Sequence, residues 1–178
     1  MRKINYIIIS ILFSFLFIIL YSSLDNERIY NTKDLIGKKI SQVEINLFQS
    51  NETINTEEFI NNEFTILNFW ASWCAPCKKA FPALCEIQNE YLEKDVVVVG
   101  VNVDKDKSSM EKFLRKNNHN FKIFFDIDKN LVSELNVKTM PTTFIVDKNF
   151  KIIAEKQGYF KKTKSEIKSI LDKLIDEK

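Results

Sequence analysis

The 178-residue sequence has a single histidine, three cysteines, three glycines and three prolines. One histidine, His119, is too few for a histidine-rich metal site, and three cysteines can form one pair but no disulfide framework. So little glycine and proline excludes a collagenous or low-complexity chain. With 45% hydrophobic and 28% charged residues, the composition is that of a globular protein of one domain.

Most of the chain also lacks an excess of either charge. The formal net charge is +2, and Arg2 and Lys3 are the only charged residues among residues 1–24. Beyond them, 24 of the 26 basic residues remain against 24 acidic ones, so the rest of the chain is neutral. A domain without net positive charge lacks the excess of basic residues that is typical of nucleic-acid-binding proteins, and we expect no nucleic-acid partner.

An apolar run without charge covers residues 4–21, directly after Arg2 and Lys3. A helix of that length, at about 1.5 Å per residue, spans roughly 27 Å, which is close to the hydrocarbon thickness of a bilayer. The basic flank is expected to stay in the cytoplasm. We therefore predict one N-terminal transmembrane helix that serves as an uncleaved anchor. A cleaved signal peptide is the alternative, although Ser22 and Ser23 make a poor cleavage site.

This interpretation divides the chain into three parts. Residues 1–23 are the predicted membrane anchor or uncleaved signal, residues 24–35 a polar linker, and residues 36–178 one domain. In a bacterium, such a chain would be a single-pass protein of the inner membrane, with its domain facing the periplasm or the outside.

Strand and helix patterns alternate through the predicted domain. Strands are predicted at residues 43–48, 53–55, 64–71, 96–103, 122–125, 142–146 and 151–156. Helices are predicted from Cys74, from a capping box of Ser108 and Glu111, from Asp128 as a cap, and from a capping box of Thr163 and Glu166. This order predicts an α/β fold, with a mixed central sheet and helices on both faces.

The chemistry-bearing motif is Cys74-Ala75-Pro76-Cys77, between a predicted buried strand and a helix. The first turn of a helix has unpaired N–H groups and a partial positive charge, which would stabilise the Cys74 thiolate and lower its pKa. Cys77, one turn later, could then attack a mixed disulfide held on Cys74 and release the product. The motif predicts thiol–disulfide exchange.

Two other interpretations of the pair are a stabilising disulfide and half of a zinc site. A disulfide across two residues closes a very small loop, so it removes little unfolded-state entropy. A zinc site needs two more ligands, and Cys85 lies about 12 Å farther along the helix from Cys77. We predict that Cys85 is a buried thiol on the core face and that His119 is a surface loop residue.

These motifs resemble the thioredoxin superfamily. Residues 68–79, NFWASWCAPCKK, and residues 139–147, TMPTTFIVD, are similar to the TlpA/ResA/CcmG branch of membrane-anchored bacterial thiol–disulfide oxidoreductases. The similarity extends over roughly residues 36–178. It implies a thioredoxin-like fold and a redox-active Cys74–Cys77 disulfide, with no metal and no other cofactor.

The resemblance also implies how the site is arranged. Pro141 would be a cis-proline facing the cysteines, and the backbone of Met140 would pair with an extended substrate segment. An ordinary trans-proline at the start of a strand is the alternative. Trp73, Ala75 and Pro76 would support the active site and contact the substrate.

Two positions depart from the family pattern. Thioredoxin has a buried aspartate where this chain has Asn68, and many members of the branch have a glutamate where it has Ala80. Those acids assist proton transfer from the resolving thiol. The group that takes the proton of Cys77 is therefore not identified, and water or Glu86 are the candidates.

The function that the resemblance implies is reduction of protein disulfides outside the cytoplasm, as in cytochrome c maturation. Apocytochrome c or its maturation factors would be substrates, and a membrane thiol reductase would supply electrons. Disulfide oxidation or isomerisation is the first alternative. A thiol peroxidase or a copper-delivery protein fits the motif less well, since residues 68–73 have no upstream threonine or proline and the cysteine spacer is short.

Overall fold

The computed structural model of this chain describes residues 6, 11–19, 35–48, 50, 52–158 and 163–177. They belong to two compact units, Met1–Thr32 and Lys33–Lys178. In the first unit, residues 11–19 are helical, and their side chains are exposed. No helix within the described ranges is long and apolar enough to cross a membrane. Most of the predicted anchor and of the predicted linker lies outside the described residues.

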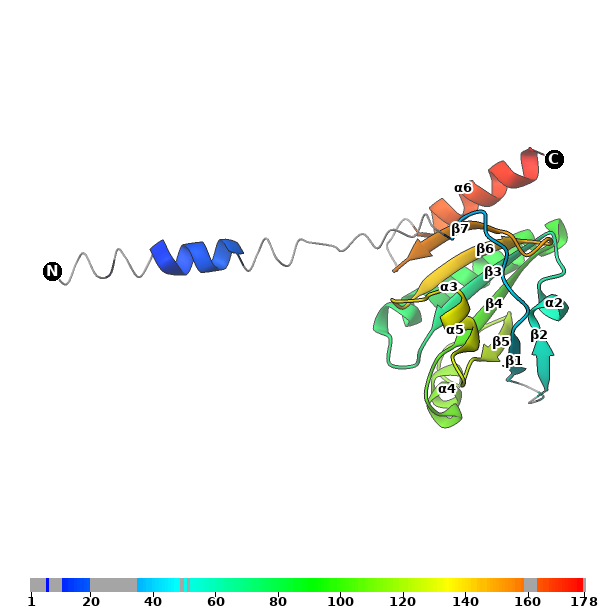
Figure 1. The fold of residues 1–178 in the computed structure, drawn as a ribbon, viewed down its shortest axis with the longest axis horizontal. Helices are drawn as coiled ribbons and strands as arrows, with labels where there is room; N and C mark the ends of the chain where they lie inside the picture. The colour runs from blue at the N-terminus through cyan, green and yellow to red at the C-terminus, as the bar shows by residue number, and fades with distance from the viewer. Residues whose placement is uncertain are drawn as a thin grey trace. The chain divides into compact units, whose positions relative to one another are not determined.

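A seven-stranded sheet forms the second unit (Figure 1), in the order β2-β1-β5-β4-β3-β6-β7. The strands are β1 Glu44–Leu47, β2 Thr53–Asn55, β3 Phe64–Trp70, β4 Val96–Asn102, β5 Lys122–Phe125, β6 Thr142–Asp147 and β7 Ile152–Gln157. β4 runs parallel to β3 and β5, and the other pairs are antiparallel. The predicted mixed sheet is confirmed, and the neighbouring strands β1–β2 and β6–β7 form antiparallel hairpins.

In the described part of the second unit, five α-helices connect or follow these strands. They are α2 Thr56–Phe59, α3 Ala75–Tyr91, α4 Lys107–Leu114, α5 Asn130–Glu134 and α6 Thr163–Asp176, and a short 3-10 turn, η2 Leu92–Lys94, extends α3. The sequence patterns did not predict α2. This single turn depends on Asn55, whose side chain caps it while Glu58 bonds back to the Asn55 N–H.

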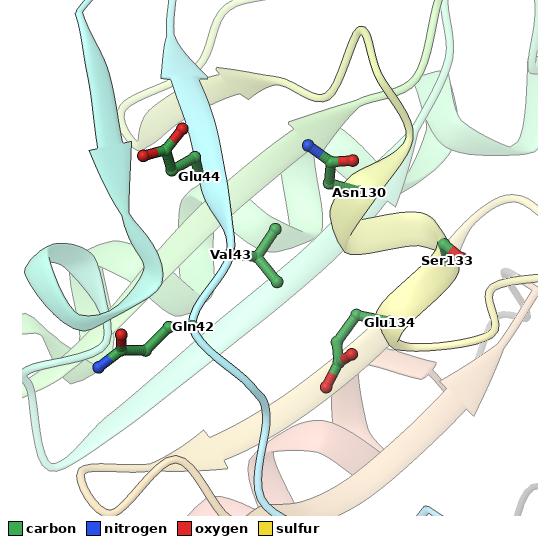
Figure 2. Close-up of a pocket in the computed structure, with 6 residues that line it drawn as sticks. All are labelled: Gln42, Val43, Glu44, Asn130, Ser133 and Glu134. Carbon is green, nitrogen blue, oxygen red and sulfur yellow. The ribbon is translucent and has the colours of Figure 1, made fainter.

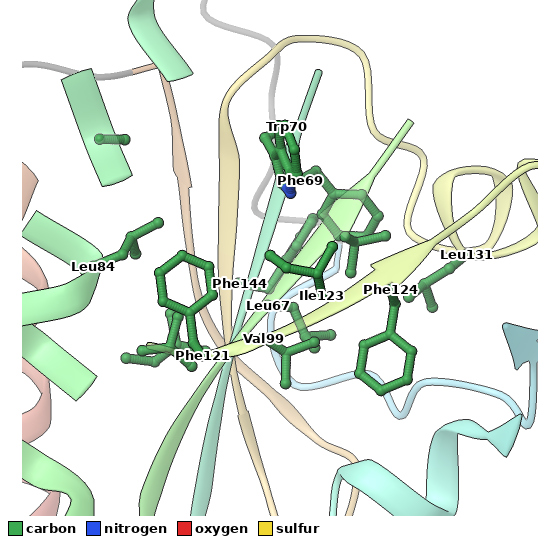
Figure 3. Packing of buried hydrophobic residues seen from close by; sticks show 14 of the residues in the cluster. Leu67, Phe69, Trp70, Leu84, Val99, Phe121, Ile123, Phe124, Leu131 and Phe144 are labelled. Carbon is green, nitrogen blue, oxygen red and sulfur yellow. The ribbon is translucent and has the colours of Figure 1, made fainter. Parts of the chain in front are cut away.

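Helices cover both faces of the sheet, as predicted. On one face, Trp70 of β3 contacts Phe81 of α3 and Phe113 of α4, with ring centroids 4.9 and 4.7 Å apart. The strand register turns Phe124 of β5 to the other face, because neighbouring residues of a strand alternate in direction. There its ring lies 4.6 Å from that of Phe59 in α2. Figure 3 shows Trp70 and Phe124 among other aromatic and aliphatic side chains of the core.

The predicted caps of two helices are wrong. α4 begins before Ser108, and its cap is Asp106, whose carboxylate accepts the Ser109 N–H at 2.9 Å. For α5, Asp128 is not the cap. Instead the buried carboxylate of Asp126 accepts the first free N–H groups of the helix, including that of Val132 at 2.9 Å. In both places an aspartate two residues upstream competes for the same N–H groups.

Candidate active site

The strand β3 leads the chain directly to the cysteine pair. All seven of its residues are buried, and a short loop then carries the chain into α3 with Cys74 as the N-cap. Cys74 Sγ accepts the backbone N–H of Cys77 at 3.2 Å, and the two sulfurs form a disulfide with a Cα–Cα distance of 5.3 Å. A sulfur in this position faces the unpaired N–H groups and the positive end of the helix.

Solvent reaches the two cysteines unequally. Cys74 is 4% exposed and Cys77 is 0% exposed, so Cys74 is the residue of the pair that solvent reaches. Ala75 and Pro76, between them, are exposed at the surface of the first helical turn. Pro76 is tolerated there because an N–H at that position would have no partner within the helix.

Trp73 and the segment Met140–Pro141 come to the same end of the sheet as the cysteines. Trp73 is 73% exposed, which is unusual for so large an apolar side chain in a folded domain. The Met140–Pro141 peptide bond is cis, as the resemblance implies. Because Phe69 of β3 pairs with Thr142 of β6, this segment lies where β3 enters the cysteine loop. The structure thus brings the two sequence motifs together.

A buried carboxylate that the sequence analysis missed holds the loop in front of Cys74. Asp104, only 2% exposed, accepts the N–H and the hydroxyl of Ser72 at 3.1 Å, and the Asn102 side-chain amide at 2.9 Å. The signal in the sequence was an aspartate directly after the buried strand 96–103. Parallel strands end at the same edge of a sheet, and this edge carries the cysteine loop.

The two positions that depart from the family pattern line one small cavity. Asn68, Ala80, Pro141 and Thr143 surround a space of about 10 Å³, close to the minimum that one water molecule needs. Asn68 donates its side-chain amide to Thr143 Oγ1 at 2.9 Å, while its carbonyl oxygen is buried without a described partner. None of the residues described as lining this cavity is acidic.

Glu86, the other candidate for the Cys77 proton, points elsewhere. It is exposed on α3, and its carboxylate forms an ion pair with Lys164 of α6. Glu86 also lies nine residues beyond Cys77, about 13 Å along the helix. Its position fits a contact between two helices.

The remaining cysteine and the histidine lie away from the pair. Cys85 is half-buried rather than fully buried, because its position on α3 borders the loop before β5. Its Sγ lies 3.6 Å from the carbonyl oxygen of Asn118. His119 is a half-buried loop residue with its ring 5.9 Å from that of Phe121. Among the residues that the structure describes, no group of three or more His, Cys, Asp or Glu side chains could hold a metal ion.

We expect Cys85→Ala to keep full disulfide-reducing activity. The thiol lies two turns beyond Cys77 on α3 and packs against the rim of the core. Losing a half-buried sulfur should lower the free energy of unfolding by no more than about 1 kcal/mol. Insulin reduction and urea denaturation measure the two effects. A tenfold drop in turnover with unchanged stability would make Cys85 a redox participant.

Another groove, of about 510 Å³, lies between the segment leading into β1 and the helix α5 (Figure 2). Figure 2 shows Glu44 and Glu134 on its two sides. Glu134 accepts the backbone N–H of Ser41 at 2.9 Å, so this carboxylate serves to join α5 to the neighbouring segment. The groove includes neither Cys74 nor Cys77.

Glu155 on β7 is a half-buried carboxyl group near the strand that follows Pro141. One of its oxygens accepts the Gln157 side-chain amide at 2.9 Å, and the other is buried without a described partner. Burial raises the pKa of Glu155 above its ordinary value of 4.5. A raised pKa of an acid in the folded state means that ionisation opposes folding.

We therefore expect Glu155→Gln to stabilise the protein in a pH-dependent way. In the wild type, the folded state is favoured while the carboxyl group of Glu155 is protonated. That contribution is lost as pH rises from about 4.5, the ordinary pKa, through the higher pKa of the folded state. The glutamine variant has no group to ionise there and does not lose it. The melting temperature of the variant, relative to wild type, should rise between acidic and neutral pH. Thermal unfolding monitored by circular dichroism across this range measures the difference. A difference that shrinks toward neutral pH would contradict the assignment.

Comparisons with known proteins agree with this geometry. The model of the Redoxin family matches residues 35–172. A curated relative, the thiol-disulfide oxidoreductase ResA of Bacillus thuringiensis, is 31% identical over 108 residues, which are 61% of this chain and 61% of the relative's own length. Among solved structures, a Chlorobium tepidum protein described as a thiol:disulfide interchange protein DsbE has a TM-score of 0.73 and 27% identity, over 79% of this chain and 97% of its own. StoA from Bacillus subtilis has a TM-score of 0.62 and 27% identity, over 74% and 97%. These matches confirm the thioredoxin-like fold and the resemblance to the TlpA/ResA/CcmG branch.

Proposed function

This chain belongs to the redoxin family, and we propose that it is a thiol–disulfide oxidoreductase that reduces disulfide bonds of proteins through Cys74 and Cys77. The observation that carries the proposal is the position of the pair. Cys74 caps the helix α3 and is the more exposed residue of the pair, while Cys77 is fully buried one turn inside. The names of the relatives, a thiol-disulfide oxidoreductase and a thiol:disulfide interchange protein, support it.

The proposed reaction begins with the reduced pair. The Cys74 thiolate, stabilised by the N-terminal end of α3, attacks one sulfur of the substrate disulfide. The substrate S–S bond breaks, its second sulfur leaves as a thiolate that takes a proton, and a mixed disulfide with Cys74 forms. Cys77 then loses its proton and attacks Cys74, which releases the substrate sulfur as a second thiol. Two electrons pass to the substrate, and the Cys74–Cys77 disulfide remains.

Asn68 and Ala80 limit how Cys77 can lose its proton. Neither side chain can accept a proton near neutral pH, and Glu86 is paired with Lys164. We infer that the proton leaves through water or to the departing substrate thiolate. The small cavity beside Asn68 has room for one water, and the carbonyl oxygen of Asn68, which has no partner among the described residues, would accept a hydrogen bond from it.

We also propose that the direction is reductive and that substrates resemble those of cytochrome c maturation, with Met140 and Pro141 beside the bound segment. A membrane thiol reductase would restore the dithiol. Equilibration of the purified protein with glutathione buffers tests the direction. A reduction potential well below −200 mV supports a reductant, whereas a value near about −120 mV would identify a disulfide oxidase.

The location follows from the same proposal. We propose that residues 1–23 anchor the protein in the bacterial inner membrane with the domain outside the cytoplasm, since the charge pattern of these residues favours that orientation. Fractionation of cells, with protease added to intact spheroplasts, tests it. A full-length chain recovered in the soluble fraction, or a domain protected from protease, would contradict the anchor or its orientation.

A further inference from the structure

A groove of about 440 Å³ borders Cys74 on the side of α4. Trp73 and Cys74 form one wall, and Phe113 of α4 contributes to the other. Three lysines also line it: Lys78, Lys112 and Lys116. The groove starts at the sulfur that would attack a substrate, so a polypeptide joined to Cys74 has to pass close to it.

No acidic side chain is among the residues described as lining this groove. The acids close in sequence to α4 have other partners as well. Asp106, the cap of α4, accepts the N–H and the hydroxyl of Ser109 and also interacts with Lys112, and Glu111 lies 3.9 Å from Arg115. The buried Asp104 accepts the N–H of Ser72, which lines the groove. The groove therefore presents positive charge that its own lining does not balance.

The lysine on α3 is not placed to stabilise its helix. Lys78 lies in the first turn of α3, where the partial charge of the helix is positive and a cation is unfavourable. Lys112 and Lys116, near the end of α4, are in the favourable position for a cation. Helix stability thus explains the charge of α4 but not that of Lys78, and the groove brings together lysines from two separate elements.

We propose that this lysine groove, defined by Lys78, Lys112 and Lys116, binds an acidic segment next to the cystine of the substrate protein. Carboxylates of aspartate or glutamate complement the three ammonium groups, and the exposed face of Trp73 offers an apolar contact to the same segment. The preferred substrates are then proteins with acidic residues flanking the disulfide. This inference rests on the proposed function, because the groove selects what Cys74 attacks.

Paired peptide substrates test the inference on the full-length protein in detergent. Two short peptides with the same internal disulfide differ only in the flanking residues, which are aspartates in one and lysines in the other. At low salt, the reduced protein should react with the acidic peptide about tenfold faster or more, because complementary charge raises the association rate. At about 1 M salt, where the Debye length is about 3 Å, the preference should largely disappear.

Reversing the charge of two groove lysines tests whether the preference for the acidic peptide arises in the groove. In Lys112→Glu/Lys116→Glu, the preference for the acidic peptide should invert. The matched control Lys38→Glu/Lys39→Glu has the same net charge, but its exposed positions pair with the start of β7, at the opposite end of the sheet from Cys74. That control should keep the wild-type preference. Each rate is divided by the rate of the same protein with uncharged hydroxyethyl disulfide, which corrects for changes in the cysteine pair.

The outcomes separate the two proposals. Equal rates with both peptides at low salt, while hydroxyethyl disulfide is reduced, would overturn the lysine groove and leave the proposed function standing. The same would follow if the Lys38→Glu/Lys39→Glu control lost the preference as fully as the groove variant. A wild-type protein that reduces none of the three disulfides would overturn both.

Discussion

Replacing Cys74 by serine is expected to abolish disulfide reduction, with a loss of at least ~10³-fold in turnover. A serine hydroxyl is far more basic as an alkoxide than a thiolate is, so the end of helix α3 cannot make it a nucleophile near neutral pH. Cys77 cannot replace it, since that sulfur is 0% exposed and a bulky substrate disulfide cannot approach it. Insulin reduction with dithiothreitol as the electron source measures the loss.

Cys77→Ser should behave differently and serves as the matched variant. Cys74 remains able to attack, but no thiol can resolve the mixed disulfide, so the protein should accumulate joined to its substrate. Non-reducing electrophoresis and mass spectrometry detect that adduct, and Cys85→Ala in the same background should not change its yield. Trapping by Cys74→Ser instead of Cys77→Ser would reverse the assignment of attacking and resolving thiols.

Trp70→Ala is expected to lower the free energy of unfolding by about 3–5 kcal/mol. The indole of Trp70 is fully buried and lies between α3, α4 and the sheet, against the rings of Phe81 and Phe113. The backbone of Gly100 also comes close, since a methyl group placed there would lie 3.1 Å from the indole nitrogen. Removing the ring would leave a cavity directly beneath the loop that carries Cys74. Equilibrium unfolding in urea measures the change.

Trp70→Phe is the control for this prediction. It keeps an aromatic ring in contact with α3 and α4, and it removes an indole N–H that is buried without a described partner. Because losing an unsatisfied buried donor offsets part of the lost packing, we expect the destabilisation to be less than half of that of Trp70→Ala. Equal destabilisation by both variants would contradict this prediction. It would show that the indole N–H has a hydrogen-bond partner, or that only the indole ring fills this part of the core.

Much of the fold was predictable because its signals are local. The apolar runs that became β3 and β4 are buried on both faces, and such strands read as continuous hydrophobic stretches. The motif Cys74-Ala75-Pro76-Cys77 lies between a strand and a helix, so its position at the start of a helix was also predictable from the sequence. The caps of α4 and α5 were predicted wrongly because several aspartates and serines in one stretch compete for the same N–H groups, and only backbone geometry selects Asp106 and Asp126.

The parts of the site that depend on contacts distant in sequence were not predictable. Asp104 reaches Ser72 across 32 positions, because two parallel strands end at one edge of the sheet. Asn68 and Ala80 line one cavity with Pro141 because β3 pairs with β6 and α3 packs against them. The lysine groove likewise joins residues at the start of α3 with residues in and just after α4, which no local pattern relates. The periodicity of apolar residues predicts which side chains of a helix or strand are buried. It does not predict which residues they contact, because those contacts depend on strand order and helix packing, which arise from the whole chain.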